Sequence, residues 1–271
     1  MTTVHTLASG SSGNALLVSC GETHLLVDAG ISCRRITVSL AELGLTPQDL
    51  SAILITHTHS DHISGMQTLL KRTDCRVCGS SRTCSGLDYR LAGIRDRLET
   101  LSPCTPTVLG DFTVTAVPTS HDAPGACGYR LDTADGSVGI LTDTGFITEE
   151  AADLLPGVDL VILESNHDVE AVRCGPYPYY LKERILGSGG HLSNETAAAF
   201  AVALAESGAG EIVLAHLSQE NNSPAMAYNA VERALCTAGY APCDSGLHLS
   251  VAPRDRLSCA YPVLRRNICR K

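Results

Sequence analysis

Short apolar runs that end in polar residues constrain the fold of this chain more than any other feature. Ser51–Thr56 (SAILIT), Ser137–Thr142 and Asp159–Leu163 each have the length and composition of a buried strand. Phe112–Pro118 follows a turn and alternates with period two, which also predicts a strand. Further strands are predicted at residues 15–19, 23–27, 129–132, 211–215 and 247–251.

Capped or periodic segments between these runs predict helices. They cover residues 36–43, 62–71, 87–98, 148–155, 194–206 and 224–238. Strands come first, then strands mixed with helices, then strand–helix alternation. This order favours an α/β protein with two layers of sheet covered by helices. The Tyr- and Pro-rich segment Cys174–Tyr180 is predicted to be a surface loop or a loop at the edge of a site.

The composition is that of a soluble globular protein. The 271 residues are 44% hydrophobic and 18% charged. No apolar run is long enough to cross a bilayer, and the N-terminus lacks the basic and apolar regions of a secretory signal. We therefore expect a cytoplasmic protein with no membrane contact and no obligate protein partner.

The charge is unevenly distributed along the chain. A formal net charge of −9 argues against a broadly basic nucleic-acid-binding protein. Residues 71–97 and the segment 254–271, predicted to be a C-terminal tail, are nevertheless rich in Arg and Lys. Two interpretations stay open for these stretches: solvated surface, or the flanks of a groove that binds a polyanion.

Twelve cysteines are scattered singly along the chain. Without a secretory signal, and in a chain large enough to need no staples, we expect free thiols. Cys75 and Cys78 form a CxxC pair, with Cys84 and Cys104 further on. A zinc knuckle is the less favoured alternative, because the spacing to the later cysteines fits no standard pattern.

The strongest chemical signal is His57-Thr-His-Ser-Asp-His62, directly after the strand SAILIT. A strand that runs into a loop places its next residues at a sheet edge, where sites of α/β proteins are built. A hydrophobic core cannot easily satisfy three histidines and an aspartate within six residues. Imidazole suits zinc and related metals, and carboxylate compensates their charge, so the segment predicts a metal site.

This motif resembles the HxHxDH signature of the metallo-β-lactamase superfamily. Three further residues follow later strands in the order that this family shows: His121, Asp143 and His216. The resemblance implies that His57, His59 and His121 bind one ion, that Asp61, His62 and His216 bind a second, and that Asp143 bridges them. It also implies a four-layer αβ/βα sandwich of two mixed sheets flanked by helices, and two divalent ions, zinc or manganese.

Several segments resemble one subgroup, the YycJ/WalJ-type proteins, which are related to tRNase Z and ribonuclease J. They are Gly10–Asn14, Val27–Gly30, Ser120–Asp122, Glu164–Asp168, Gly190–Asn194 and the HLSQENN segment that begins at His216. The resemblance extends to about Val251, which predicts a hydrolase domain over residues 1–253. It implies a DNA exonuclease that acts on double-stranded ends through metal-activated hydroxide attack on phosphorus.

His191 and Asp61 are the predicted catalytic residues. His191 lies in a Gly-His motif that, in the RNA-processing relatives, supplies a histidine outside the metal ligands, and its ordinary pKa suits proton transfer to a leaving oxygen. Asp28 is predicted to orient a metal-binding histidine. Ser12 and Asn14 are candidate phosphate contacts or members of a simple turn. His167 is a candidate contact to phosphate or to a ligand, or a surface residue.

Two alternative functions remain. A small-molecule (cyclic) phosphodiesterase or other ester hydrolase on the same fold agrees with the acidic net charge. A non-catalytic metal-binding protein is ranked last, because the ligand set and His191 are all present.

Overall fold

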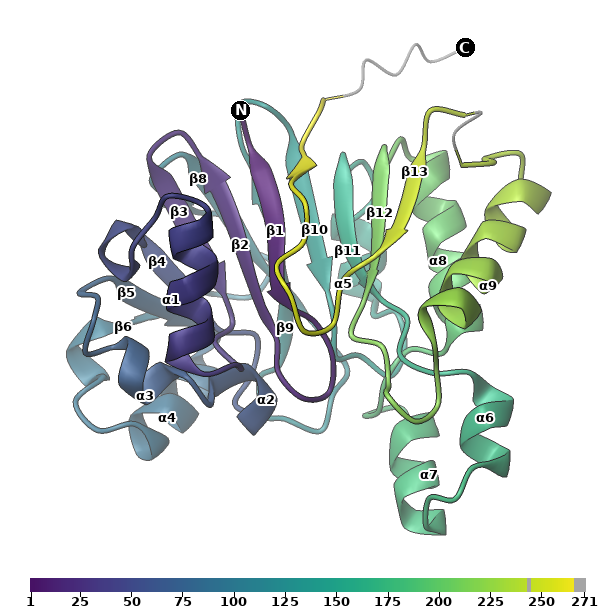
Figure 1. Cartoon of the computed structure of the whole chain (residues 1–271), viewed down its shortest axis with the longest axis horizontal. Helices are drawn as coiled ribbons and strands as arrows, with labels where there is room; N and C mark the ends of the chain where they lie inside the picture. The colour runs from purple at the N-terminus through teal and green to yellow at the C-terminus, as the bar shows by residue number, and fades with distance from the viewer. Residues whose placement is uncertain (243–244, 266–271) are drawn as a thin grey trace.

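Two facing β-sheets form the centre of the molecule, with helices on both outer sides (Figure 1). The computed structural model describes residues 1–242 and 245–265. The first sheet contains β14 (Tyr261–Pro262), β1 (Thr3–Ala8), β2 (Ala15–Cys20), β3 (Thr23–Val27), β4 (Ala52–Leu54), β5 (Arg76–Gly79) and β6 (Leu98–Thr100), in this order. The second contains β13 (His248–Val251), β12 (Glu211–Ala215), β11 (Leu160–Glu164), β10 (Ser137–Leu141), β9 (Cys127–Asp132), β8 (Phe112–Pro118) and β7 (Thr107–Leu109).

The helices complete an αβ/βα sandwich, which confirms the predicted fold. They are α1 (Cys33–Glu42), α2 (Ser60–Ile63), α3 (Met66–Leu69), α4 (Ser81–Arg90), α5 (Glu149–Leu154), α6 (Val169–Cys174), α7 (Tyr179–Leu186), α8 (Asn194–Glu206) and α9 (Pro224–Thr237). Short 3₁₀ turns occupy Pro47–Asp49 and Arg95–Arg97. None of the helices in the described part of the chain could span a membrane.

Three layers of apolar side chains hold the sandwich together. Because successive strand residues face opposite sides, Ile162 of β11 joins the core between the sheets, while Val161 and Leu163 join the core beneath the helices of the second sheet. The parallel strands are buried on both faces, which explains why they appear in the sequence as continuous apolar runs. Leu26 of β3 likewise joins the core beneath the helices of the first sheet.

Two predicted helices differ from the structure. The helix predicted at residues 62–71 is divided into α2 and α3 at Gly65, whose backbone N–H donates to the Ala29 carbonyl at 2.8 Å. The helix predicted at residues 87–98 is wrong, because α4 begins after its N-cap Ser80 and ends at Arg90. Gly93 then adopts a φ of 75°, which turns the chain out of the helical path.

The strands β1, β5, β6, β7 and β14 were not among the predicted strands. The last of these is short and pairs with β1, opposite Thr3 and Val4. Residues that follow Pro253 therefore return to the first sheet, where Val263 is buried. The predicted tail contacts the domain through this segment, and residues 266–271 lie outside the described part of the chain.

The ten cysteines among the described residues are free thiols. Cys78 belongs to the core between the sheets, whereas Cys75 packs on the helix-covered side of the first sheet. Residues three apart on an extended chain face opposite sides, so the CxxC pair cannot converge on one ion. No metal-capable cluster of the described residues contains a cysteine, and the zinc knuckle finds no support.

The strand ends bring distant segments to one edge of the sandwich. Gly30 lies there against Asp61, and a Cβ atom on Gly30 would be 1.5 Å from the Asp61 carbonyl oxygen. Only glycine allows this approach between the segment after β3 and the loop and helix α2 that follow β4. Asn14 joins the contact by donating its N–H to the same carbonyl at 2.8 Å.

Gly30→Ala should lower the free energy of unfolding by more than about 3 kcal/mol, because the added methyl group must displace this loop. The variant should also retain less metal. Gly44→Ala is the matched control: Gly44 has a φ of 77° but open space around it, so a cost of only about 1–2 kcal/mol is expected. Urea unfolding and elemental analysis measure both effects, and equal losses in the two variants would contradict the prediction.

Candidate metal centre

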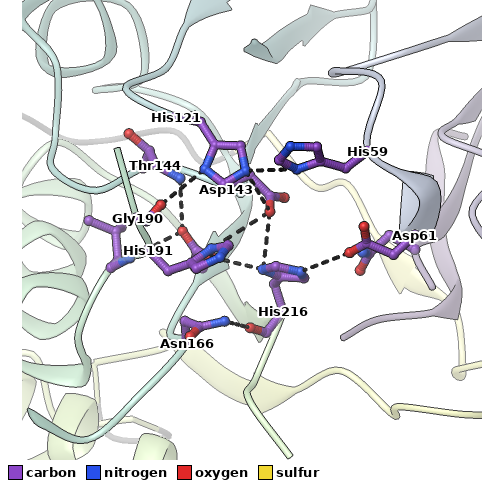
Figure 2. A network of polar contacts seen from close by, with 12 residues as sticks. His59, Asp61, His121, Asp143, Thr144, Asn166, Gly190, His191 and His216 are labelled. Atoms are coloured by element: carbon purple, nitrogen blue, oxygen red, sulfur yellow. Dashed lines mark hydrogen bonds and ion pairs between the residues drawn. The ribbon is translucent and has the colours of Figure 1, made fainter. Parts of the chain in front are cut away.

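The seven predicted ligands meet at the carboxyl edge of the two sheets. The ligand atoms of His57, His59 and His121 lie within 4.8 Å of one another, and the same limit holds for Asp61, His62 and His216. Asp143 stands between these two groups. Figure 2 shows its carboxylate surrounded by imidazoles that come from different loops.

The distances from Asp143 explain how it reaches both groups. One carboxylate oxygen, Oδ2, lies 3.4 Å from His62 Nε2. The other, Oδ1, lies 3.5 Å from His216 Nδ1 and 3.9 Å from His121 Nε2. A carboxylate in this position is suited to bridge two cations, one in each group of ligands.

Three buried ligand atoms lack a hydrogen-bond partner in the protein. They are His57 Nε2, Asp143 Oδ2 and His216 Nε2. A buried polar atom without a partner costs about 1–3 kcal/mol, so native proteins rarely keep several together. Imidazole nitrogen and carboxylate oxygen are the donors that zinc and manganese accept. The residues present therefore fit divalent cations.

The electrostatics of the cluster also favour added positive charge. Burial by itself would lower the pKa of His216, but Asp143, Asp61 and Glu164 outweigh it and raise the pKa to about 10. Burial would raise the pKa of Asp143, yet the surrounding imidazoles, His216 first, hold it well below its ordinary value. The carboxylates thus stabilise a cation at these nitrogens, whether a proton or a metal ion.

Asp28 supports the ligand His62 from behind. Its Oδ2 lies 2.7 Å from His62 Nδ1, and its Oδ1 accepts from the Thr56 N–H at 2.9 Å. A hydrogen bond at Nδ1 leaves Nε2 of the same ring directed toward Asp61 and Asp143. The structure therefore places Asp28 against a histidine of the cluster.

Glu164 is a site residue that the sequence interpretation missed. It is fully buried, and its Oε1 lies 2.9 Å from His191 Nδ1 and 2.8 Å from His216 Nδ1. Burial would raise its pKa, but the charges and hydrogen bonds of these two histidines lower it to about 2. The sequence did contain a sign of this role, since Glu164 is a carboxylate at the end of the apolar strand Leu160–Glu164. The predicted ligands also follow the ends of strands.

Strained backbone accompanies the functional side chains. Asp28, Asp143 and His216 have φ values of 61°, 58° and 54°, in the left-handed region that non-glycine residues seldom adopt. The His216 conformation is held by its N–H, which donates to Ser9 Oγ at 2.9 Å, and by its carbonyl, which accepts from Asn166 Nδ2 at 2.8 Å. Such strain persists only where the surroundings impose it.

The remaining predicted residues lie in different places. Asn14 Nδ2 is 3.1 Å from His62 Nε2, at the edge of the cluster. Ser12 is exposed, whereas its neighbour Ser11 lines the central pocket. His167 is only 1% exposed and does not line that pocket, so it is not placed to contact a phosphate. Three histidines that were not predicted site residues lie outside the cluster: His5 on β1, His24 on β3 and His248 on β13.

The central pocket above the cluster has a volume of about 240 Å³ and is lined by Asp61, Asp143, His191 and His216, among others. Side chains from α7 and the loop before it, Tyr177 and Arg184, form another wall. The segment predicted to be a site-edge loop thus contributes Tyr177. Arg184 Nε donates to Asp122 Oδ2 at 2.6 Å, which ties α7 to the loop that carries His121.

Residues 23–217 match the β-lactamase superfamily domain, a stretch that includes every ligand described above. The chain belongs to this superfamily. Exodeoxyribonuclease WalJ of Streptococcus pneumoniae serotype 2 is 37% identical over 235 residues, which are 86% of this chain and 87% of that protein. Exodeoxyribonuclease YycJ of Bacillus anthracis is 35% identical over 86% of this chain and 89% of its own length. The predicted family is confirmed, and so is the prediction that the chain is a hydrolase.

Solved structures with lower sequence identity share the fold. The metallo-β-lactamase fold protein YhfI of Bacillus subtilis superimposes with a TM-score of 0.71 at 17% identity, over 95% of this chain and 99% of that one. The short form of human tRNase Z gives a TM-score of 0.64 at 18% identity, over 95% of this chain and 98% of that one.

His167 should make stability depend on pH. Burial lowers its pKa to about 4, whereas the unfolded chain takes up a proton near 6.5. Between these values the unfolded state binds more protons, so the free energy of unfolding should fall as the pH drops from 6.5 to 4, by at most about 3 kcal/mol. Urea unfolding of the wild type and of His167→Asn at pH 8 and pH 4.5 measures this change. The comparison separates the effect of His167 from the loss of metal at low pH, because metal loss affects both proteins. An equal decrease in the two would contradict the prediction.

Proposed function

We propose that the chain is a dinuclear, divalent-metal phosphodiesterase that shortens double-stranded DNA from its ends. The observation that carries the proposal is the paired ligand cluster with Asp143 between its halves and His191 beside it. The names of the two relatives, both exodeoxyribonucleases of similar length, support DNA as the substrate.

In this proposal His57, His59 and His121 hold one ion, Asp61, His62 and His216 hold the other, and Asp143 contacts both. When bound, such a pair of ions neutralises charge on a phosphate and supplies a nucleophile from water at neutral pH. The protein side chains fix the arrangement. Asp28 keeps His62 in one orientation, and Glu164 does the same for His216.

His191 is the proposed proton donor to the departing oxygen. Its Nδ1 is engaged by Glu164 at 2.9 Å, which leaves Nε2 for the substrate. The ring lines the central pocket and is one-fifth exposed, whereas His57, His62 and His216 are buried. The carboxylate of Glu164 fixes the orientation of the ring, and we assign to Nε2 the proton that the departing oxygen takes up when the P–O bond breaks.

The second candidate function is hydrolysis of a small diester, which the net charge of −9 favours. The deciding experiment gives the purified protein end-labelled linear duplex DNA and bis-p-nitrophenyl phosphate, each with manganese or zinc. We expect progressive shortening of the duplex, and loss of that activity in Asp61→Asn. Cleavage of the small diester alone would favour the second candidate. Inactivity of metal-loaded protein on both would favour a non-catalytic role.

His191→Ala should lower kcat on duplex DNA by about 100-fold or more, because the leaving oxygen loses its proton donor. Metal content should stay at that of the wild type, since His191 is proposed to lie outside the ligand set. Elemental analysis and single-turnover assays measure the two quantities. His248→Ala, on the exposed end of β13, is the control. Loss of metal in His191→Ala would show that His191 is a ligand instead.

A further inference from the structure

A second cavity adjoins the central pocket. Its volume is about 430 Å³, and Ser218 lines both spaces. Ser218 is two residues from His216, so the two Cα atoms are at most about 7 Å apart. The loop after β12, the first residues of α9 and the segment 251–256 enclose this space, which we call the arginine cavity. In Figure 1 the last of these segments is the yellow strand end and loop beside β12.

The lining of the arginine cavity is cationic. Arg254 and Arg256 both contribute to it, and no Asp or Glu of the described residues does. Hydrogen-bonding side chains of Gln219, Asn222 and Ser223 lie around it. Ser223 is the N-cap of the 14-residue helix α9, so the positive end of that helix faces the same space. The cavity therefore suits an anion, whereas the central pocket, with Asp61 and Asp143, suits cations.

Arg254 is held in place beside the metal cluster. Its carbonyl accepts from the Ser9 N–H at 3.1 Å, and Ser9 Oγ in turn accepts from the His216 N–H at 2.9 Å. The guanidinium donates to Gln219 Oε1 at 2.6 Å, while its Nε lies 3.8 Å from Asp255. Arg256 is exposed and has no ion-pair partner among the described residues. One arginine is thus positioned in advance, and the other is available to a ligand.

Two other basic regions have acidic residues beside their arginines. The cavity on the other side of Arg256 contains Arg34 and Arg35 but also Glu42 and Asp255, which oppose an anion. In the basic stretch 71–97, three arginines form ion pairs within the protein: Arg76 with Glu99, Arg95 with Asp88, and Arg97 with Asp74. Arg254 and Arg256 differ from these arginines because they line a cavity beside the metal cluster to which no acidic residue of the described chain contributes.

We propose that the arginine cavity binds a backbone phosphate of the DNA strand whose scissile phosphate lies in the central pocket. The inference rests on the nuclease function proposed above and assigns Arg254 and Arg256 as its phosphate contacts. A DNA strand carries one charge per about 3.4 Å of helix axis, so a strand in the central pocket presents further phosphates to an adjoining cavity. This contact gives an acidic protein a local site for a polyanion.

The test uses Arg256→Ala, Arg254→Ala and the control Arg233→Ala, which removes the same charge from the exposed side of α9. Fluorescence anisotropy with a labelled duplex measures binding at several salt concentrations, without turnover. Each cavity variant should bind about five- to tenfold more weakly than wild type. The slope of log K against log salt should decrease by about one. Hydrolysis of bis-p-nitrophenyl phosphate should change less than twofold, because that diester is too small to reach the cavity.

Arg256 is exposed, so its variant tests the inference even if Arg254→Ala folds poorly. Binding and salt slopes in Arg256→Ala equal to those of Arg233→Ala would overturn the arginine cavity as a phosphate site. A loss of small-diester activity as large as the loss of DNA binding would also overturn it, since the arginine would then act on the metal cluster. Arginine-dependent binding without shortening of the duplex would leave the cavity standing and refute only the nuclease function.

Discussion

Mutual compensation of buried charge at one edge of the sandwich is the interaction on which the site depends. Asp143 is a buried carboxylate that would be costly to ionise alone, and His62 and His216 are imidazoles that burial would keep neutral. Brought together, each lowers the cost of the other's charge. Removal of one member would leave a buried partner uncompensated, which explains why the proposed ligands cannot be treated as independent.

The same arrangement separates two electrostatic environments that lie side by side. Asp61 and Asp143 line the central pocket and favour cations, while Arg254 and Arg256 line the arginine cavity, which begins two residues beyond His216. A polyanionic substrate needs both, because metal ions act at one phosphate while protein cations hold another. A net charge of −9 is therefore compatible with a nucleic-acid substrate, provided that the positive charge is local.

Elements with a strong local pattern were predictable, and those defined by partners were not. The apolar run at Leu160–Glu164 and the capped helix α8 follow from burial and capping. By contrast, β14 has two residues, and only its pairing with β1 makes it a strand. The break between α2 and α3 depends on how closely Gly65 approaches Ile31, a contact that no periodicity contains.

For the site, the local signal was the placement of imidazoles and carboxylates directly after strands. Such residues have no use in a core, so the chemistry of residues 57–62 predicted a metal site at a strand end. The resemblance to the superfamily implied the full ligand set, with His121, Asp143 and His216. The pairing of Asp28 with His62, the use of Glu164 to hold two histidines and the position of Arg254 behind His216 came only from the folded chain. These contacts join residues 27 or more positions apart, and their geometry is set by how the two sheets pack, which local sequence patterns do not specify.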